Sequence, residues 1–387
     1  MKYSKVLAVA LALFSSPLHA DEVKIGELHP ITGPLSFFGL PMSRAMQLAV
    51  EQINTAGGID VSGTKYTIGL LTGDTQANPT IGVAALKKLT AEGATYLVGP
   101  LHGAVAPALK PIVERDESLT LIVDGATPDG LPTGKNIFRN QTTVQGFTKP
   151  IIAHAGDKKI KTIAFITDRY HTAQISSEEA DIASFSAVGT EVVAREYMKL
   201  GDTDFSAQLT KIVAAKPESI LFRTYPNEAA LMTKQARQLG YEGTIIWVVL
   251  APPATVLKNI SSAEMEGVLN GYPPAAEDLA KLGEVNAKAF VEAYKAKFGD
   301  APGELSALSY DAVYIIKAAI EKAGSIDNKV VNQVLAGIQL SEIPELVNVY
   351  KAQPDGRLFN NAGQADFQGV VHVWKDGHWV PLSAASN

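Results

Sequence analysis

Side chains suited to binding a small molecule recur in this sequence at the turn between an apolar stretch and a segment of helical periodicity. Three of these turns contain His102-Gly103-Ala104, Gly125-Ala126-Thr127 and Tyr170-His171. In an open α/β sheet such turns lie at the carboxyl ends of the strands, where ligands bind. A helix that starts there presents unpaired N–H groups and a positive dipole end to an anion. The pattern predicts ligand binding through backbone, imidazole and hydroxyl groups.

Each turn also has a plain structural interpretation. Thr127 offers a hydroxyl group and Gly125 a carbonyl acceptor to a ligand, but Thr127 equally caps the turn that follows. His102 is either a hydrogen-bond donor to a ligand or a surface histidine. The residues alone leave both interpretations open.

Two further positions suit a ligand with a ring or a carboxylate. A strand ends at Phe222-Arg223-Thr224-Tyr225, and residues two apart point to one side of a strand, so Arg223 and Tyr225 are predicted to share a face. Arg223 is either a carboxylate partner or an arginine on a solvated loop. Phe38 follows the first strand and faces either a cleft or the core.

The first strand, loop and helix that position such groups run from Val23 to Ile59. Apolar residues at the start form a short strand, and Gly33-Pro34 break the chain before a helix begins. From Pro41 onward apolar residues recur every three or four positions, which is one face of an amphipathic helix. Gly57-Gly58 end that helix. A second helix is predicted to start at Asn78-Pro79, with asparagine as its cap.

Strands and helices alternate along most of the chain, which is typical of parallel, doubly wound sheets. The predicted strands after the first are 66–71, 96–98, 120–123, 162–167, 191–197, 219–222 and 244–250. Tyr272-Pro273-Pro274 then breaks the chain, three helical patterns follow, and short β segments after Val347 include a hairpin at Asp376-Gly377. The predicted fold class is α/β, with two doubly wound parallel-sheet lobes.

The opening of the chain resembles a known family. A T-G-P motif that begins at Thr32, the pair Phe38-Gly39, a long helix and I-N-x-x-G-G-I from Ile53 are similar to the leucine/isoleucine/valine-binding family, the periplasmic receptors of ABC importers. The resemblance implies a type I periplasmic binding protein fold with a three-crossing hinge near Thr142, Tyr272 and Pro344. Lobe 1 would then comprise residues 21–142 and 273–344, and lobe 2 residues 143–272 and 345–387.

The resemblance also implies roles for particular residues. The family places an aromatic ring at Phe38, small or hydroxyl residues at His102 to Ala104, a binding turn at Gly125 to Thr127 and a stacking ring at Tyr225. The loop from Tyr170 departs from the pattern, because Ala173 stands where glycine is expected. The implied ligand-binding residues are Phe38, His102, Gly103, Ala104, Gly125, Ala126, Thr127, Tyr170, His171, Arg223, Tyr225 and Leu250.

The absence of an acidic residue from Val248 to Ala251 bears on the ligand. Amino-acid receptors of the family hold the ligand ammonium with an acid near this segment, and this sequence has none there. A buried ammonium without a counter-charge is costly. Either another acid replaces it, or the ligand is an organic anion without an α-amino group, such as an aromatic carboxylate.

Composition limits the other possibilities. The chain has 387 residues, 46% of them hydrophobic, with a net charge of -6 and no cysteine. The acidic balance argues against nucleic acid as a partner, and the missing cysteine excludes disulfides and thiolate chemistry. Residues 1–20 have the basic start and apolar run of a signal peptide, so we expect a mature chain from Asp21 and a periplasmic location.

No catalytic motif accompanies the predicted lobes. G-x-S-x-G, H-E-x-x-H, P-loop and dinucleotide-binding patterns are missing, and the histidines lack metal-ligand spacing. We therefore expect a monomeric binding protein, not an enzyme, without a cofactor or metal, that delivers a small amino acid or carboxylate to an inner-membrane ABC permease. The alternatives are a ligand sensor of the same fold and a secreted α/β hydrolase.

Overall fold

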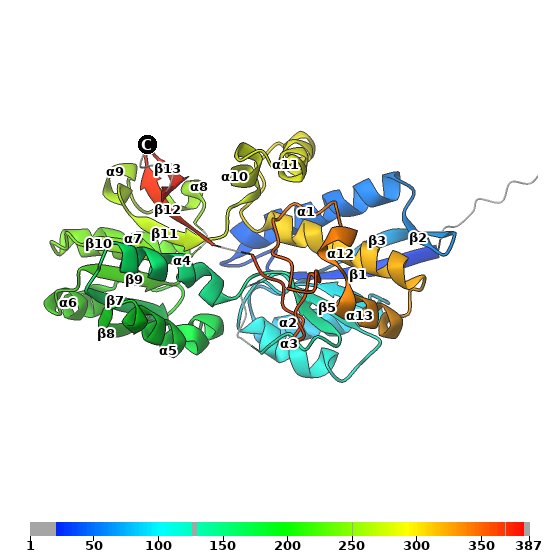
Figure 1. Cartoon of the computed structure of the whole chain (residues 1–387), viewed down its shortest axis with the longest axis horizontal. Helices are drawn as coiled ribbons and strands as arrows, with labels where there is room; N and C mark the ends of the chain where they lie inside the picture. The colour runs from blue at the N-terminus through cyan, green and yellow to red at the C-terminus, as the bar shows by residue number, and fades with distance from the viewer. Residues whose placement is uncertain (1–20, 126–129, 250, 368, 383–387) are drawn as a thin grey trace, which may run out of the picture.

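The structure is a computed structural model that describes residues 21–125, 130–249, 251–367 and 369–382. These residues form two α/β lobes that lie side by side, each built on one sheet with helices packed against it (Figure 1). No helix in these ranges is long and apolar enough to span a membrane. The fold is the predicted α/β class with two sheets.

The sheet of the first lobe has six strands in the order β2-β3-β1-β4-β5-β6. Their bounds are β1 Asp21–His29, β2 Ile59–Val61, β3 Thr64–Asp74, β4 Tyr96–Val98, β5 Thr120–Val123 and β6 Ile137–Arg139. All neighbours are parallel except the short edge strand β2, which pairs antiparallel with β3. The central strand β1 is buried from Ile25 to its end, as expected for a strand covered on both faces.

Helices from both ends of the sequence cover this sheet. Those from the first part of the chain are α1 Ser36–Thr55, α2 Pro79–Ala91 and α3 Val105–Val113, and the later ones are α11 Val285–Phe298, α12 Ser306–Ala323 and α13 Asn328–Gly337. The orange and yellow helices α12 and α11 lie against the blue α1 in Figure 1. The first lobe is therefore completed by a segment that follows most of the second lobe in the sequence.

The sheet of the second lobe has seven strands in the order β13-β12-β11-β10-β9-β7-β8. Their bounds are β7 Thr162–Asp168, β8 Glu191–Met198, β9 Ser219–Arg223, β10 Thr244–Trp247, β11 Leu269–Tyr272, β12 Val370–Lys375 and β13 His378–Pro381. The strands β7 to β11 are parallel, whereas β12 and β13 add an antiparallel hairpin. Both sheets are thus mainly parallel with antiparallel strands at one edge, which confirms the predicted fold of two doubly wound lobes.

The other helices lie mainly with the second sheet. Their bounds are α4 Val144–Asp157, α5 Thr172–Ala187, α6 Ser206–Ala214, α7 Pro226–Gln238, α8 Pro253–Val256, α9 Ser262–Met265 and α10 Ala276–Lys281, and one 3-10 turn spans Leu340–Glu342. The chain passes between the lobes after β6, between β11 and α11, and between α13 and β12. The lobe boundaries at 142, 272 and 344 stay a prediction.

Local signals placed several elements correctly. The Asn78 side chain accepts hydrogen bonds from the backbone N–H groups of Thr80 and Ile81 at the start of α2. The turn Asp376-Gly377 joins β12 to β13, and both residues have positive φ, as a two-residue hairpin turn requires. The start of α1 differs from the prediction, because the helix begins at Ser36 and contains Pro41 in its second turn.

Candidate ligand-binding site

A cavity between the two lobes, here called the cleft cavity, contains several of the predicted residues. It is about 50 Å³ in volume and is lined by Phe38, Leu101, Gln141, Phe147, His171, Gln174, Thr224, Tyr225, Val248, Val249 and Leu305. Phe38 lies in the first turn of α1, and Leu305 precedes α12 on the first lobe. The residues from Phe147 to Val249 come from elements of the second lobe.

Three helices begin beside one another at this cavity. The caps of α5 and α7 are His171 and Tyr225, whose ring centroids are 5.3 Å apart. The first-lobe turn before α3 brings the ring of His102 to 6.2 Å from that of Tyr225. Each helix start carries the positive end of a dipole and N–H groups that have no partner within the helix. The arrangement favours negative charge in the cavity.

The two histidines contribute neutral hydrogen-bonding groups. Burial, followed by the electrostatic effects of the neighbouring His102 and Arg223, lowers the pKa of His171 to about 3. Burial lowers the pKa of His102 to about 4. The Nδ1 atom of His171 accepts a long hydrogen bond of 3.4 Å from the Gln174 backbone N–H, so the proton of the neutral ring sits on Nε2. His171 is therefore a donor at neutral pH.

Tyr225 is the central aromatic residue of the site. Its side chain is buried, and burial raises its pKa well above the ordinary value, so the hydroxyl stays protonated. The nearby Asp168 and Glu228 act in the same direction. A protonated phenol both donates and accepts a hydrogen bond, while its ring gives an apolar surface for a ligand.

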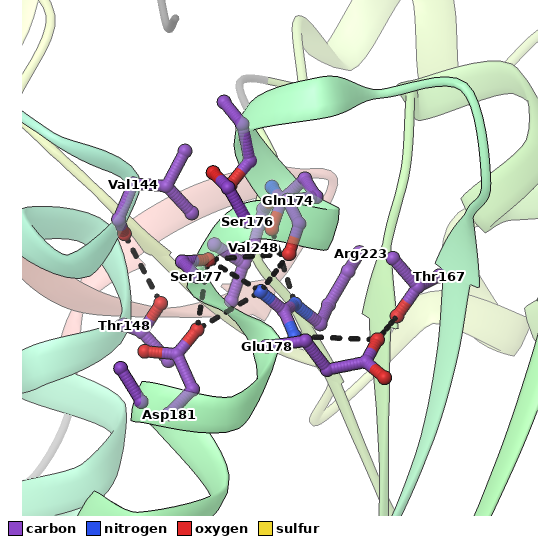
Figure 2. Close-up of polar contacts among 12 residues, drawn as sticks. Val144, Thr148, Thr167, Gln174, Ser176, Ser177, Glu178, Asp181, Arg223 and Val248 are labelled. Carbon is purple, nitrogen blue, oxygen red and sulfur yellow. Dashed lines mark hydrogen bonds and ion pairs between the residues drawn. The ribbon is translucent and has the colours of Figure 1, made fainter. Parts of the chain in front are cut away.

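Behind the second-lobe wall of the cleft cavity lies a buried polar network centred on Arg223 (Figure 2). The guanidinium donates to the Gln174 side-chain oxygen at 3.1 Å and to the Asp181 carboxylate at 2.9 Å, and its Nη1 lies 3.7 Å from Glu178. Gln174 in turn donates to the Val248 carbonyl oxygen at 3.4 Å. Arg223 thereby fixes Gln174, which does line the cavity.

Arg223 itself does not reach the cleft cavity, which corrects the expectation that it shares a face with Tyr225. Strand β9 ends at Arg223, and Tyr225 is already the cap of α7. The two-residue alternation of a strand applies only while the strand lasts. The guanidinium consequently points toward α5, while the tyrosine ring lies in the cavity wall.

The other predicted residues are placed as follows. Phe38, His171 and Tyr225 line the cavity, whereas His102 and Gly103 do not. The Gly103 carbonyl oxygen instead accepts a hydrogen bond of 2.7 Å from the Thr172 hydroxyl. The last residue before α3 is Ala104.

Gly125 does not line the cavity but allows a close approach of the chain, since a side chain there would lie 2.2 Å from the Leu101 carbonyl oxygen. Tyr170 is 62% exposed and does not line the cavity. Its backbone N–H donates a hydrogen bond to the Asp168 carboxylate within the turn. Ala126, Thr127 and Leu250 lie outside the described residues.

Several cavity residues were not predicted from the sequence. These are Leu101, Gln141, Phe147, Gln174, Thr224, Val248, Val249 and Leu305. Gln174 had a usable signal, because it lies in the first turn of the helix that follows the predicted loop at His171. The apolar members had none, since their side chains are typical of core positions everywhere in the chain.

The charges available at the site limit its chemistry. No carboxylate lines the described part of the cleft cavity. Within the described residues no group of three or more His, Asp or Glu side chains is placed to hold a metal ion. The site offers helix starts, neutral donors and aromatic walls, which are suited to holding a small ligand.

Comparisons with known proteins identify relatives of this chain. Residues 22–368 match the family described as periplasmic binding protein. The leucine-, isoleucine-, valine-, threonine- and alanine-binding protein of Pseudomonas aeruginosa is 29% identical over 376 residues, which cover 95% of this chain and 94% of that protein. The crystal structure of a leucine-binding protein of Thermotoga maritima has a TM-score of 0.79 at 26% identity, covering 93% of this chain and 97% of that one.

A third comparison concerns a different ligand. The structure of an ABC transporter solute-binding protein of R. palustris in complex with benzoate has a TM-score of 0.75 at 19% identity. It covers 93% of this chain and 95% of that one, and at this identity the likeness concerns the fold.

Proposed function

The chain belongs to the periplasmic binding protein family, and from this premise we propose that it captures a small organic carboxylate between its lobes and delivers it to an inner-membrane ABC permease. The chain is a binding protein, not an enzyme. We further propose that residues 1–20 are an export signal and that the mature protein acts in the periplasm.

The observation that carries the proposal is the meeting of three helix starts at a cavity without a described carboxylate. His171 and Tyr225, the caps of α5 and α7, line this cavity and stay neutral there as hydrogen-bond donors, and the turn before α3 reaches the cavity through Leu101. Together the helix dipoles and donors stabilise an anion without a buried cation. An ammonium group would find no counter-charge among the described lining residues.

An amino-acid ligand is the second candidate, and the Pseudomonas aeruginosa relative favours it. That protein is a receptor for leucine, isoleucine, valine, threonine and alanine by its description. The benzoate complex of R. palustris supports the carboxylate alternative within the same fold. Both candidate classes carry a carboxylate and only the amino acids carry an ammonium group, so a binding screen with ligands of each class separates them.

The first prediction concerns which class of ligand stabilises the protein and which of two tyrosine substitutions weakens ligand binding. Benzoate or 4-hydroxybenzoate is expected to raise the melting temperature, because a ligand that binds only the folded protein stabilises it. Tyr225→Ala should weaken the binding by about 30-fold, the effect of removing a buried aromatic anchor worth about 2 kcal/mol. Tyr170→Ala is the matched control, since its exposed ring lies outside the cavity. Thermal shift and calorimetry measure both effects.

The outcomes of this screen are distinct. If leucine, isoleucine or valine raises the melting temperature and no carboxylate without an amine does, the ligand is an amino acid and the carboxylate proposal is wrong. If Tyr225→Ala and Tyr170→Ala weaken binding equally, the cleft cavity is not the binding site.

Closure of the lobes is supported by a contact across the cleft. The Thr172 hydroxyl of α5 donates a hydrogen bond of 2.7 Å to the Gly103 carbonyl of the first lobe. The closed cavity measures about 50 Å³, whereas a cavity that holds benzene measures about 150 Å³. A ring-sized ligand therefore enters only if the walls move apart, as in hinge motion.

The second prediction concerns that contact. Thr172→Val removes the hydroxyl and is expected to weaken ligand binding by about fivefold, because one hydrogen bond is worth about 1 kcal/mol in the closed form. Thr90→Val is the matched control, since the Thr90 hydroxyl makes a similar bond, to the Lys87 carbonyl, within the first lobe. Calorimetric titration measures both variants, and equal affinities would contradict a role in closure.

A further inference from the structure

A second space between the lobes, here called the side compartment, lies next to the cleft cavity. It is about 340 Å³ in volume. Its first-lobe wall includes Phe37 and Glu304, and its second-lobe wall includes Tyr272 and Trp379. The rings of Phe37 and Phe38 are 4.4 Å apart, and Phe38 lines the cleft cavity. The two spaces are therefore neighbours that share the first turn of α1 as a boundary.

The carboxyl group of Glu304 has no matching positive charge. Its Oε2 atom is sealed from solvent without a hydrogen-bond partner among the described residues, and no described ion pair includes the side chain. The other acids of the compartment do have partners, since Glu277 lies 2.7 Å from Lys295 and Asp278 lies 3.8 Å from Lys281. A desolvated carboxylate without a cation is unfavourable, so Glu304 is an open position for positive charge.

The walls around this acid suit an organic cation. Tyr272 and Trp379 are buried, and Phe37 is partly buried. Ring faces attract ammonium groups, and aromatic cages are a known means of recognising them. A space of about 340 Å³ exceeds the roughly 150 Å³ that accommodates a benzene molecule. The acid, the aromatic walls and the volume of the compartment thus all favour a small organic cation.

We propose that the side compartment is a second binding site, specific for a small primary or quaternary ammonium ion held by Glu304 between the rings of Phe37, Tyr272 and Trp379. The site takes its walls from both lobes, so an ion bound there stabilises their closed arrangement. It is independent of the carboxylate proposal, because none of these four residues lines the cleft cavity.

Proton release accompanies binding at this site. Burial raises the pKa of the Glu304 carboxyl to about 8, and the charges of Asp278 and Glu277 add to this effect. A cation binds the ionised carboxylate better than the protonated acid, so the affinity rises as the pH increases through about 8. His378 on β13 and Lys281 on α10 also line the compartment, so the titration is repeated with His378→Gln.

The test uses tetramethylammonium and butylammonium chloride as probes, with neopentyl alcohol as a neutral probe of similar size. Trp379 lines the compartment, so tryptophan fluorescence reports binding. Calorimetry measures the affinity independently. Glu304→Gln keeps the shape and removes the charge, and it is expected to weaken cation binding about tenfold or more. Glu277→Gln is the matched control, because its carboxylate is already paired with Lys295, and it should leave the affinity nearly unchanged.

Three results would overturn the proposal. The first is that the wild type and Glu304→Gln bind the ammonium probes with equal affinity. The second is that neopentyl alcohol binds as well as the ammonium probes. The third is that neither cation gives a saturable signal in the millimolar range. Glu304→Gln replaces a buried carboxyl group by a neutral amide of the same shape, so it is expected to fold, which a urea titration checks. The Tyr225→Ala variant separates the two sites, since it should reduce carboxylate binding and leave the cation titration unchanged.

Discussion

Replacement of Arg223 by methionine is expected to lower the free energy of unfolding by about 3–5 kcal/mol, because it leaves buried carboxylates without their cation. The guanidinium is fully buried, 2.9 Å from Asp181 and 3.7 Å from Glu178. It also lies over the ring of Phe165 at 5.4 Å. Methionine fills much of the volume but supplies none of the hydrogen bonds. Urea denaturation of the mature protein measures the change.

Arg44 provides the matched control for this prediction. Its guanidinium lies 3.1 Å from Asp300, whose side chain is 70% exposed. Exposed ion pairs contribute at most about 1 kcal/mol, so Arg44→Ala should have a small effect. Adding Asp181→Asn to Arg223→Met should recover part of the loss, because the carboxylate that faced the guanidinium then no longer carries a charge. Equal effects of the two arginine substitutions would show that the buried network does not stabilise the fold.

Replacement of His29 by glutamine is expected to have a comparable effect, and one that depends on pH. His29 is fully buried at the end of β1, 2.9 Å from Asp124 and 3.4 Å from Glu27. Burial lowers its pKa, but the charges and hydrogen bonds of Asp124 and Glu27 outweigh burial and raise the pKa to about 10. At neutral pH the ring is therefore a buried cation between two acids, and its removal costs about 3–5 kcal/mol.

The sign of the pH dependence follows from the raised pKa. The folded protein holds the His29 proton more tightly than the unfolded chain, whose histidines titrate near 6.5. The stabilisation is complete below about pH 6.5 and is lost as the pH rises through about 10. Urea titrations across this range should show a falling free energy of unfolding in the wild type and a flatter profile in His29→Gln. Parallel profiles would contradict the assignment.

Local rules predicted much of the fold from the sequence. Asn78-Pro79 located the start of α2, and Asp376-Gly377 located the terminal hairpin. These signals work because capping and positive φ depend on a few neighbouring residues. The start of α1 at Ser36 was missed, since Pro41 suggested a first helical position. Packing of Phe38 and Leu35 in the core adds the preceding turn, which is a tertiary effect.

The candidate site was only partly predictable for a related reason. His171 and Tyr225 were found because they precede helices in predictable turns. Leu305 and Gln141 reach the cavity only through the association of the lobes, which no local pattern records. Arg223 was misplaced because its direction is determined by acids on α5, within a network of long-range contacts. No sequence pattern pointed to Glu304, since its lack of a cationic partner depends on how the neighbouring acids pair in the folded structure.

The order in which the lobes are completed has a consequence for folding during synthesis. Helix α1 packs against α12, and these elements are separated by all of β7 to β11 in the sequence. A chain that emerges from its amino end can form most of the second lobe before α12 arrives to cover α1. Until then the side of α1 that packs against α12 is uncovered, although its other side already lies on β1 and β3. The first part of the chain to be made is thus among the last to be finished, and its uncovered apolar surface is prone to aggregation until α12 arrives.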